Sequence, residues 1–298
     1  MARILVSGAT GFLGKHLVER LQREGHMVYG TTLRSPVADT ILHCDIQNQN
    51  SVDEVFDKIN PEIVIHCAAI SSVTAAEAGE YYFVNTVGAE NIVKAAVSRK
   101  NKIRYIFIST AGVYGNQDTD YLHEDLCPKP VHHYGMSKFC AERILFNYAD
   151  RIDYTVIRPF NIIGIGQSHD FLMPKLADAF SRRLEVLNLG NLDVFRDYID
   201  VSDASELIAR LTFNPAAIGQ VCNLCSGRPV SLQMLLDVFS NLTSHKIRIE
   251  IDPALIRKNE VWRLLGDATK LKSLTGGVME ISDIEQSLQR MLDGKTKS

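Results

Sequence analysis

Apolar positions in the first 160 residues fall into short runs that alternate with longer, periodic stretches. The short runs are typical of buried strands, whereas apolar residues repeated every three or four positions are typical of helices. The predicted strands are Ile4–Ser7, Met27–Thr32, Ile41–Cys44, Ile63–His66, Ile103–Ser109 and Tyr154–Arg158. The predicted helices are Phe12–Glu24, Val52–Ile59, Tyr81–Arg99 and Tyr134–Tyr148. Strands separated by helices predict an α/β fold with a doubly wound parallel sheet.

The alternation of strand-like and helix-like segments becomes irregular after Pro159. The predicted helices in this part are Pro174–Arg183, Ser202–Thr212, Leu232–Leu242 and Ile281–Leu292. The predicted strands are Val221–Leu224 and Ile247–Ile251. We therefore expect a larger domain at residues 1–160 and a smaller C-terminal lobe at residues 161–298, some segments of which return to the larger domain.

The composition narrows the class of protein. A net charge of −3 provides no basic field, so we expect no nucleic-acid partner. No apolar stretch is long enough for a membrane span or a signal-peptide core. The six cysteines are scattered, and the single CxxC of Cys222 and Cys225 has no second pair, so neither a disulfide framework nor a metal site is favoured. These observations predict a cytoplasmic protein.

Three glycines follow the first predicted strand and open the first predicted helix. They are Gly8, Gly11 and Gly14, with Phe12 and Leu13 between the last two. Glycines at such a turn let the backbone approach a pyrophosphate and let helix and strand pack closely. The diphosphate then rests on the free N–H groups of the helix N-terminus. The motif predicts a Rossmann-type dinucleotide-binding domain.

The end of the second strand carries no acidic residue: Val28–Arg34 reads VYGTTLR. A carboxylate there usually grips the ribose hydroxyls of NAD, whereas Arg34 could pair with a 2′-phosphate. This favours NADP(H) and leaves NAD(H) possible, with a solvated loop position as the other interpretation of Arg34. Asp45, after the third strand, is either an adenine contact or the cap of the next helix.

Tyr134 and Lys138 form a YxxxK one helical turn apart, so both side chains lie on one face. An ammonium and an oxidised nicotinamide nearby would lower the pKa of the phenol, which could then transfer a proton near neutral pH. Ser109 and Thr110 end the fifth strand, where ligands of parallel sheets bind. Their hydroxyls would contact a reacting oxygen or satisfy the loop backbone.

Together with HCAA at residues 66–69, Asn85 in NTVG and RPFN at residues 158–161, these motifs resemble the extended short-chain dehydrogenase/reductase family over nearly the whole chain. The resemblance implies that Tyr134 is the acid/base, that Lys138 holds the nicotinamide ribose and that Thr110 bonds the reacting oxygen. The cofactor contacts expected in total are Gly8, Gly11, Phe12, Leu13, Gly14, Arg34, Asp45, Ile46, Ala68, Ala69, Asn85, Ser109, Tyr134, Lys138, Pro159 and Phe160.

The C-terminal half resembles GDP-mannose 4,6-dehydratases and, especially, GDP-4-keto-6-deoxy-mannose reductases. The segments that carry this resemblance are residues 158–167, 190–193, 196–198, 259–261 and 266–267. By this resemblance Arg196 contacts a diphosphate, and Arg257 and Glu260 contact the nucleotide. Surface ion pairs are the alternative for both arginines. The remaining expected substrate contacts are Thr110, Asn161 and, more weakly, Lys175.

One departure separates the possible reactions. Dehydratases of this superfamily have an acid two residues before the tyrosine of the Ser109–Gly115 segment, and here that residue is Gly112. We therefore expect NAD(P)H-dependent reduction at C4 of a nucleoside-diphosphate 4-keto-6-deoxyhexose, with GDP favoured and dTDP or UDP possible. A 4-epimerase is the alternative, and a 4,6-dehydratase or a non-catalytic dinucleotide sensor is less favoured. The resemblance also implies a homodimer through helices Tyr81–Arg99 and Tyr134–Tyr148.

Overall fold

The computed structural model describes residues 1–36, 38–72, 76–256, 260–277 and 281–295. Its centre is a seven-stranded parallel sheet in the order β10-β6-β5-β4-β1-β2-β3. The strands are β1 (Arg3–Ser7), β2 (Met27–Thr32), β3 (Ile41–His43), β4 (Ile63–His66), β5 (Arg104–Ile108), β6 (Asp153–Pro159) and β10 (Gln220–Leu224). The predicted Rossmann-type sheet is confirmed, with strand ends shifted by one residue at most.

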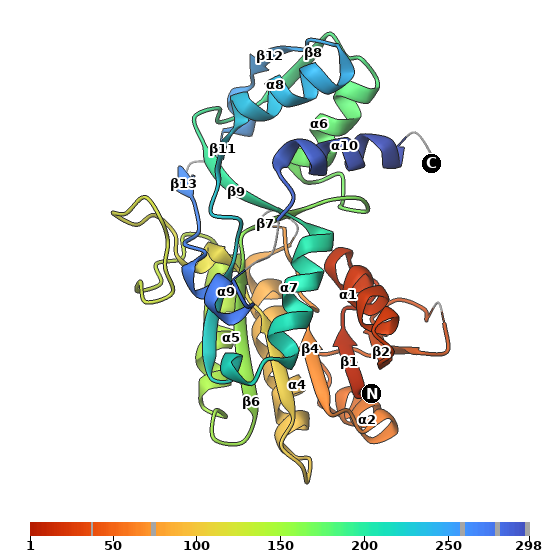
Figure 1. The fold of residues 1–298 in the computed structure, drawn as a ribbon. Helices are drawn as coiled ribbons and strands as arrows, with labels where there is room; N and C mark the ends of the chain where they lie inside the picture. The colour runs from red at the N-terminus through yellow and green to blue at the C-terminus, as the bar shows by residue number, and fades with distance from the viewer. Residues whose placement is uncertain (37, 73–75, 257–259, 278–280, 296–298) are drawn as a thin grey trace.

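Helices cover both faces of this sheet (Figure 1). On one face α1 (Phe12–Arg23) and α7 (Val201–Phe213) pack side by side, with α9 (Thr269–Leu274) contributing Leu271. On the other face lie α2 (Gln49–Ile59), α4 (Gly88–Val97) and α5 (His133–Phe146). The sheet strands are therefore buried on both sides, which is why they read as continuous apolar runs.

The helix predicted at Tyr81–Arg99 forms, from Ala78 to Val97, but it is not α-helical throughout. It consists of α3 (Ala78–Tyr82), a π-helical turn at Phe83–Val87 and α4. A π-helical turn adds a residue within a helix, and such turns are frequent at functional sites. This one carries Asn85, whose side chain is fully buried.

The smaller lobe forms its own core above the sheet (Figure 1). Its helices are α6 (Leu172–Ser181), α8 (Leu232–Thr243) and α10 (Ile284–Lys295). Its strands are β7 (Asn161–Ile163), β8 (Val186–Leu189), β9 (Phe195–Asp200), β11 (Pro229–Ser231), β12 (Arg248–Ile251) and β13 (Arg263–Leu264). β9 pairs with β7, β11 and β13, whereas α7, β10 and α9 lie against or within the large sheet.

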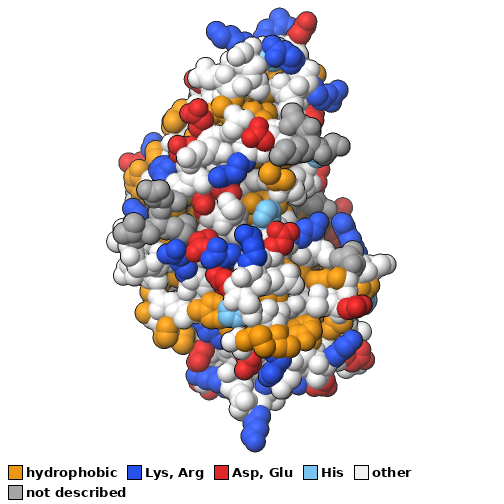
Figure 2. Space-filling view, turned by 45° about the vertical axis from the view of Figure 1, so that its right-hand side comes forward, with side chains coloured by type: hydrophobic (Ala, Val, Ile, Leu, Met, Phe, Trp, Pro, Cys, Tyr) orange, Lys and Arg blue, Asp and Glu red, His pale blue; other side chains and the backbone are white. Residues whose placement is uncertain are grey.

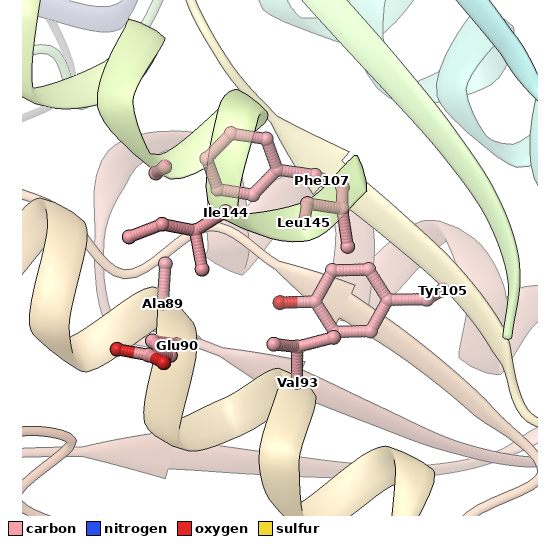
Figure 3. Close-up of a pocket in the computed structure, with 8 residues that line it drawn as sticks. Ala89, Glu90, Val93, Tyr105, Phe107, Ile144 and Leu145 are labelled. Carbon is pink, nitrogen blue, oxygen red and sulfur yellow. The ribbon is translucent and has the colours of Figure 1, made fainter. Parts of the chain in front are cut away.

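The interior between α4, α5 and β5 is tightly closed. Ala89, Val93, Phe107 and Leu145 line a gap there that leaves no room for a water molecule (Figure 3). This gap is a packing irregularity and cannot hold a ligand.

The surface carries both signs of charge. Figure 2 shows basic and acidic side chains interspersed over one face, in line with the net charge of −3. Among the described residues, no helix combines the length and the apolar character that crossing a membrane requires.

Candidate active site

The glycine loop lies at the carboxyl end of β1, beside the loop that follows β4. Gly8 has a φ of 69°, and a Cβ added there would lie 2.8 Å from the Ala68 Cα. A Cβ at Gly14 would lie 2.2 Å from the Gly8 carbonyl oxygen. No side chain caps the start of α1 at Gly11. The first N–H groups of α1 are therefore available to an anion such as a diphosphate.

A buried hydrogen-bond cluster holds these two loops together. The Ser7 Oγ accepts bonds from the main-chain N–H groups of Cys67 (3.1 Å) and Ala68 (3.2 Å). It also lies 2.6 Å from Nδ1 of His66, whose ring is fully buried. Burial, and then the nearby Lys138 charge, lower the pKa of His66 to about 3. Nothing in the sequence pattern identified Ser7 as the organiser of this region.

The end of β2, where an acid is absent, carries Thr32 and is followed by Arg34. Thr32 bonds the Thr10 hydroxyl (2.9 Å) and accepts from the Arg34 main-chain N–H (3.1 Å). The Arg34 side chain is exposed and makes no hydrogen bond or ion pair within the described residues. The Arg34 guanidinium is therefore available to bind a phosphate. The same exposure also fits a solvated loop residue.

The loop after β3 brings Asp45 and Ile46 to the same edge of the sheet. One carboxylate oxygen of Asp45 accepts from the Gln47 main-chain N–H (3.0 Å). The cap of α2 is Asn48, so Asp45 does not fill the capping role considered for it. Ile46 is buried, and its carbonyl accepts from the Asn91 side chain (2.9 Å).

α5 and the end of β5 bring the expected reacting groups together. The hydroxyls of Tyr134 and Thr110 lie near each other. Burial raises the pKa of Tyr134, and the nearby Thr110 hydroxyl acts against that rise. Thr110 Oγ1 accepts from the Gly112 main-chain N–H (3.0 Å), which holds this hydroxyl in place. Both hydroxyls can therefore contact one oxygen of a bound substrate.

Lys138 is a buried cation with unused donors. Its Nζ has no hydrogen-bond partner among the described residues and lies 4.3 Å from the centroid of the Phe107 ring. Burial lowers the pKa of Lys138 to about 8. An ammonium with unused donors fits an acceptor that the protein does not supply, such as the hydroxyls of a ribose. The glycine cradle and this orphaned ammonium together fit a nicotinamide dinucleotide.

Asn85 and Ser109 bond to the protein itself. The Asn85 amide accepts from the Ile70 N–H (2.8 Å) and donates to the Ile70 carbonyl (3.1 Å) and the Ser137 hydroxyl (3.0 Å). The Ser109 hydroxyl donates to the carboxylate of Glu142. Both residues were expected as cofactor contacts, and in this structure their side chains bond to neighbouring protein groups.

The crossing from β6 to the smaller lobe passes Pro159, Phe160 and Asn161. Pro159 and Phe160 are buried, and the Phe160 N–H donates to the Leu224 carbonyl of β10 (2.9 Å). The Asn161 side chain donates to the Asp197 carbonyl (2.8 Å) and so ties this crossing to β9.

Arg196 and Glu260 meet in the smaller lobe. Arg196 Nη2 lies 2.8 Å from Glu260 Oε1, and the Asn191 side chain donates to Glu260 Oε2 (2.9 Å). Lys175 is exposed on α6 and is not part of this cluster. Arg257 lies outside the described residues. The structure thus unites two of the four charged residues expected to contact the substrate.

Asp197 is a buried acid that sequence reasoning missed. Its side chain accepts from the main-chain N–H groups of Ser226 and Gly227 at 2.7 Å each. Burial raises the pKa of Asp197 to about 6 despite these bonds. β9 reads FRDYID, with Arg196 and Asp200 as further charged residues, so the local pattern does not mark Asp197 as a buried acid.

Known proteins are similar to this chain in both sequence and fold. The NAD dependent epimerase/dehydratase family matches residues 4–225. GDP-6-deoxy-D-talose 4-dehydrogenase of Aggregatibacter actinomycetemcomitans is 34% identical over 291 residues, covering 97% of this chain and 96% of that protein. GDP-6-deoxy-D-mannose reductase of Pseudomonas aeruginosa is 31% identical over 303 residues, covering 97% and 96%. The solved structure of RMD from Pseudomonas aeruginosa complexed with NADPH has a TM-score of 0.87 at 29% identity and covers 100% of both chains.

Proposed function

Because the chain belongs to the NAD dependent epimerase/dehydratase family, we propose that it is an NAD(P)H-dependent reductase of a nucleotide sugar. The substrate is a nucleoside-diphosphate 4-keto-6-deoxyhexose, reduced at C4, with GDP as the favoured nucleotide and NADPH as the favoured cofactor. Both relatives named above are oxidoreductases of a GDP-6-deoxyhexose, and one name specifies position 4. The neighbouring structure that holds NADPH supports the choice of cofactor.

One observation carries the proposal: the Tyr134 and Thr110 hydroxyls lie near each other, the buried Lys138 follows Tyr134 by one turn of α5, and position 112 is a glycine and not an acid. A Cβ at Gly112 would lie 3.3 Å from Thr110 Oγ1, so an acid at this position would start beside the reacting groups. Ketone reduction needs a single proton donor, whereas loss of water needs a further acid/base.

The chemistry follows from these groups. When bound, a reduced nicotinamide would supply a hydride for C4. As the carbonyl π electrons move to O4, the Tyr134 phenol gives its proton to that oxygen and becomes a phenolate. The Thr110 hydroxyl bonds the same oxygen, and the Lys138 ammonium stabilises the phenolate by its charge. The Gly8–Gly14 loop and the start of α1 hold the cofactor diphosphate.

Turnover of defined sugars tests the proposal. Purified protein is mixed with NADPH and GDP- or dTDP-4-keto-6-deoxyhexose, and the loss of reduced-nicotinamide absorbance is followed. We expect oxidation with at least one sugar and a loss of about a hundredfold or more in Tyr134→Phe. The control is Tyr148→Phe, which removes a hydroxyl near the far end of α5 that bonds Glu90 (3.2 Å) and should leave turnover unchanged.

Two outcomes would reject this assignment. No oxidation with either sugar, or equal turnover by Tyr134→Phe, excludes reduction through this site. Purified protein that retains a nucleotide and interconverts C4 epimers without added cofactor identifies the 4-epimerase instead.

A further inference from the structure

Glu142 lies on the same face of α5 as Tyr134 and Lys138, because four-residue steps along a helix return to one face. Its carboxylate is fully buried and pairs with Arg158 of β6, whose Nε and Nη2 lie 3.1 Å and 2.7 Å from Oε1 and Oε2. Oε1 also accepts the hydroxyl proton of Ser109. One carboxylate therefore joins α5 to the ends of two neighbouring strands.

The same cluster fixes the turn that follows Thr110. Arg158 Nη1 donates to the Tyr114 hydroxyl (3.0 Å), which in turn donates to Asn223 Oδ1 of β10 (2.7 Å). Ser109 directly precedes Thr110, so its bond to Glu142 holds the strand end that carries the Thr110 hydroxyl.

The Glu142 charge also acts on Lys138. Within the part of the chain that the structure describes, the charged or titratable groups that face Lys138 are Tyr134 and Glu142 on α5 and His66 and Cys67 at the end of β4. Burial lowers the pKa of Lys138, while Cys67 and Glu142 raise it. Arg158 is the other cation beside Glu142. Loss of the carboxylate would leave two cations in the same buried region.

We propose that Glu142 is a positioning residue for the reduction: through Ser109 it holds the strand end that carries Thr110, and its carboxylate is the counter-charge one helical turn from Lys138 on the same face of α5. The inference rests on the proposed function only for the identity of the reacting groups. It assigns the Ser109 hydroxyl to Glu142 and not to the cofactor.

Two variants separate the two parts of the role. Ser109→Ala removes the connection and leaves the Glu142–Arg158 pair intact. We expect kcat to fall by about tenfold or more, since small misplacements of reacting groups are costly. The Kd for NADPH and the alkaline limb of the kcat pH profile should stay unchanged. Glu142→Gln should lower kcat similarly and also move the alkaline limb to lower pH. The double variant should lose no more than Glu142→Gln alone.

The matched control is Ser205→Ala on α7, which also loses a buried serine hydrogen bond, to the Ser202 carbonyl (2.9 Å). Its kcat should equal that of the wild type. A wild-type kcat in Ser109→Ala would overturn the inference. Weaker NADPH binding by Ser109→Ala would also overturn it, because that result would mean that the Ser109 hydroxyl contacts the cofactor. These outcomes stand even if Glu142→Gln does not fold.

Failure of the proposed function is distinguishable from failure of this inference. If the wild type reduces none of the sugars, the pH dependence of NADPH binding is measured by equilibrium fluorescence instead. As the pH is raised, Glu142→Gln should lose affinity for NADPH at a lower pH than the wild type does. Ser109→Ala should lose it at the same pH as the wild type. An unshifted Glu142→Gln profile overturns the inference.

Discussion

The proposed reaction uses a few buried side chains whose burial destabilises the folded state. Lys138 is the clearest case, since its ammonium is buried without a hydrogen-bond partner among the described residues. A base whose pKa falls on folding destabilises the folded state wherever it must be protonated. Such a residue persists because the site requires it.

We predict that Lys138→Met raises stability while abolishing activity. The pKa of Lys138 is lowered to about 8 from an ordinary 10.5, so the folded state binds this proton less tightly than the unfolded state. The resulting destabilisation of the folded state is present in full below about pH 8 and disappears as the pH rises towards 10.5. Urea unfolding near neutral pH should show a gain of roughly 1–3 kcal/mol over the wild type.

Near pH 10 the gain should largely vanish. NADPH binding should weaken in the same variant, which separates a functional lysine from a packing residue. An equal stability difference at both pH values would contradict the prediction.

Arg34 is the residue expected to distinguish NADPH from NADH. Because its side chain is exposed, its bond to a 2′-phosphate should contribute no more than about tenfold in affinity. Arg34→Ala should weaken NADPH binding by up to this factor and leave NADH binding unchanged, as measured by fluorescence titration. The control is Arg23→Ala, which removes an exposed arginine at the C-terminal end of α1. Equal weakening of both cofactors would mean that Arg34 does not recognise the phosphate.

At the scale of the elements, the strands and helices that the hydrophobic pattern predicted in the large domain form, and one helix contains a turn that the pattern did not predict. The pattern from Tyr81 to Arg99 predicts one helix, because apolar spacing alone does not reveal a π-helical turn. The turn occurs where the Asn85 amide bonds the main chain of Ile70 and the Ser137 hydroxyl. These partners are distant in sequence, so the local pattern carries no sign of them.

The short strands of the smaller lobe were missed for a similar reason. β7 and β11 have three residues each, and β9 presents polar and apolar residues to different neighbours. Such segments become strands by pairing with one another around β9, and length and periodicity do not identify them.

At the scale of the whole molecule, we predict a homodimer formed by the surfaces of the π-helical turn and α5. Phe83, Val87 and Met136 are exposed apolar side chains on these elements. Light scattering at micromolar concentration should give twice the chain mass of 33.3 kDa. Phe83→Glu should give a monomer, because a charge would be buried in the interface.

The control for this experiment is Met234→Glu, which places a charge on another exposed apolar residue, on α8 in the smaller lobe. That variant should remain dimeric. A monomeric wild type, or dissociation of both variants, would reject the proposed surface.

The sequence by itself determined the family, the parallel sheet and the residues expected to react, because glycine spacing, YxxxK and apolar runs depend on local geometry. Gly8, Tyr134 and Lys138 were all predicted as site residues in this way. Only the tertiary structure decided that Ser109 bonds Glu142, that Arg196 pairs with Glu260 and that β10 joins the large sheet. The physical reason is that a buried charge is satisfied by whichever partner the fold brings to it. That partner can lie anywhere along the chain, as Glu260 does 64 residues after Arg196.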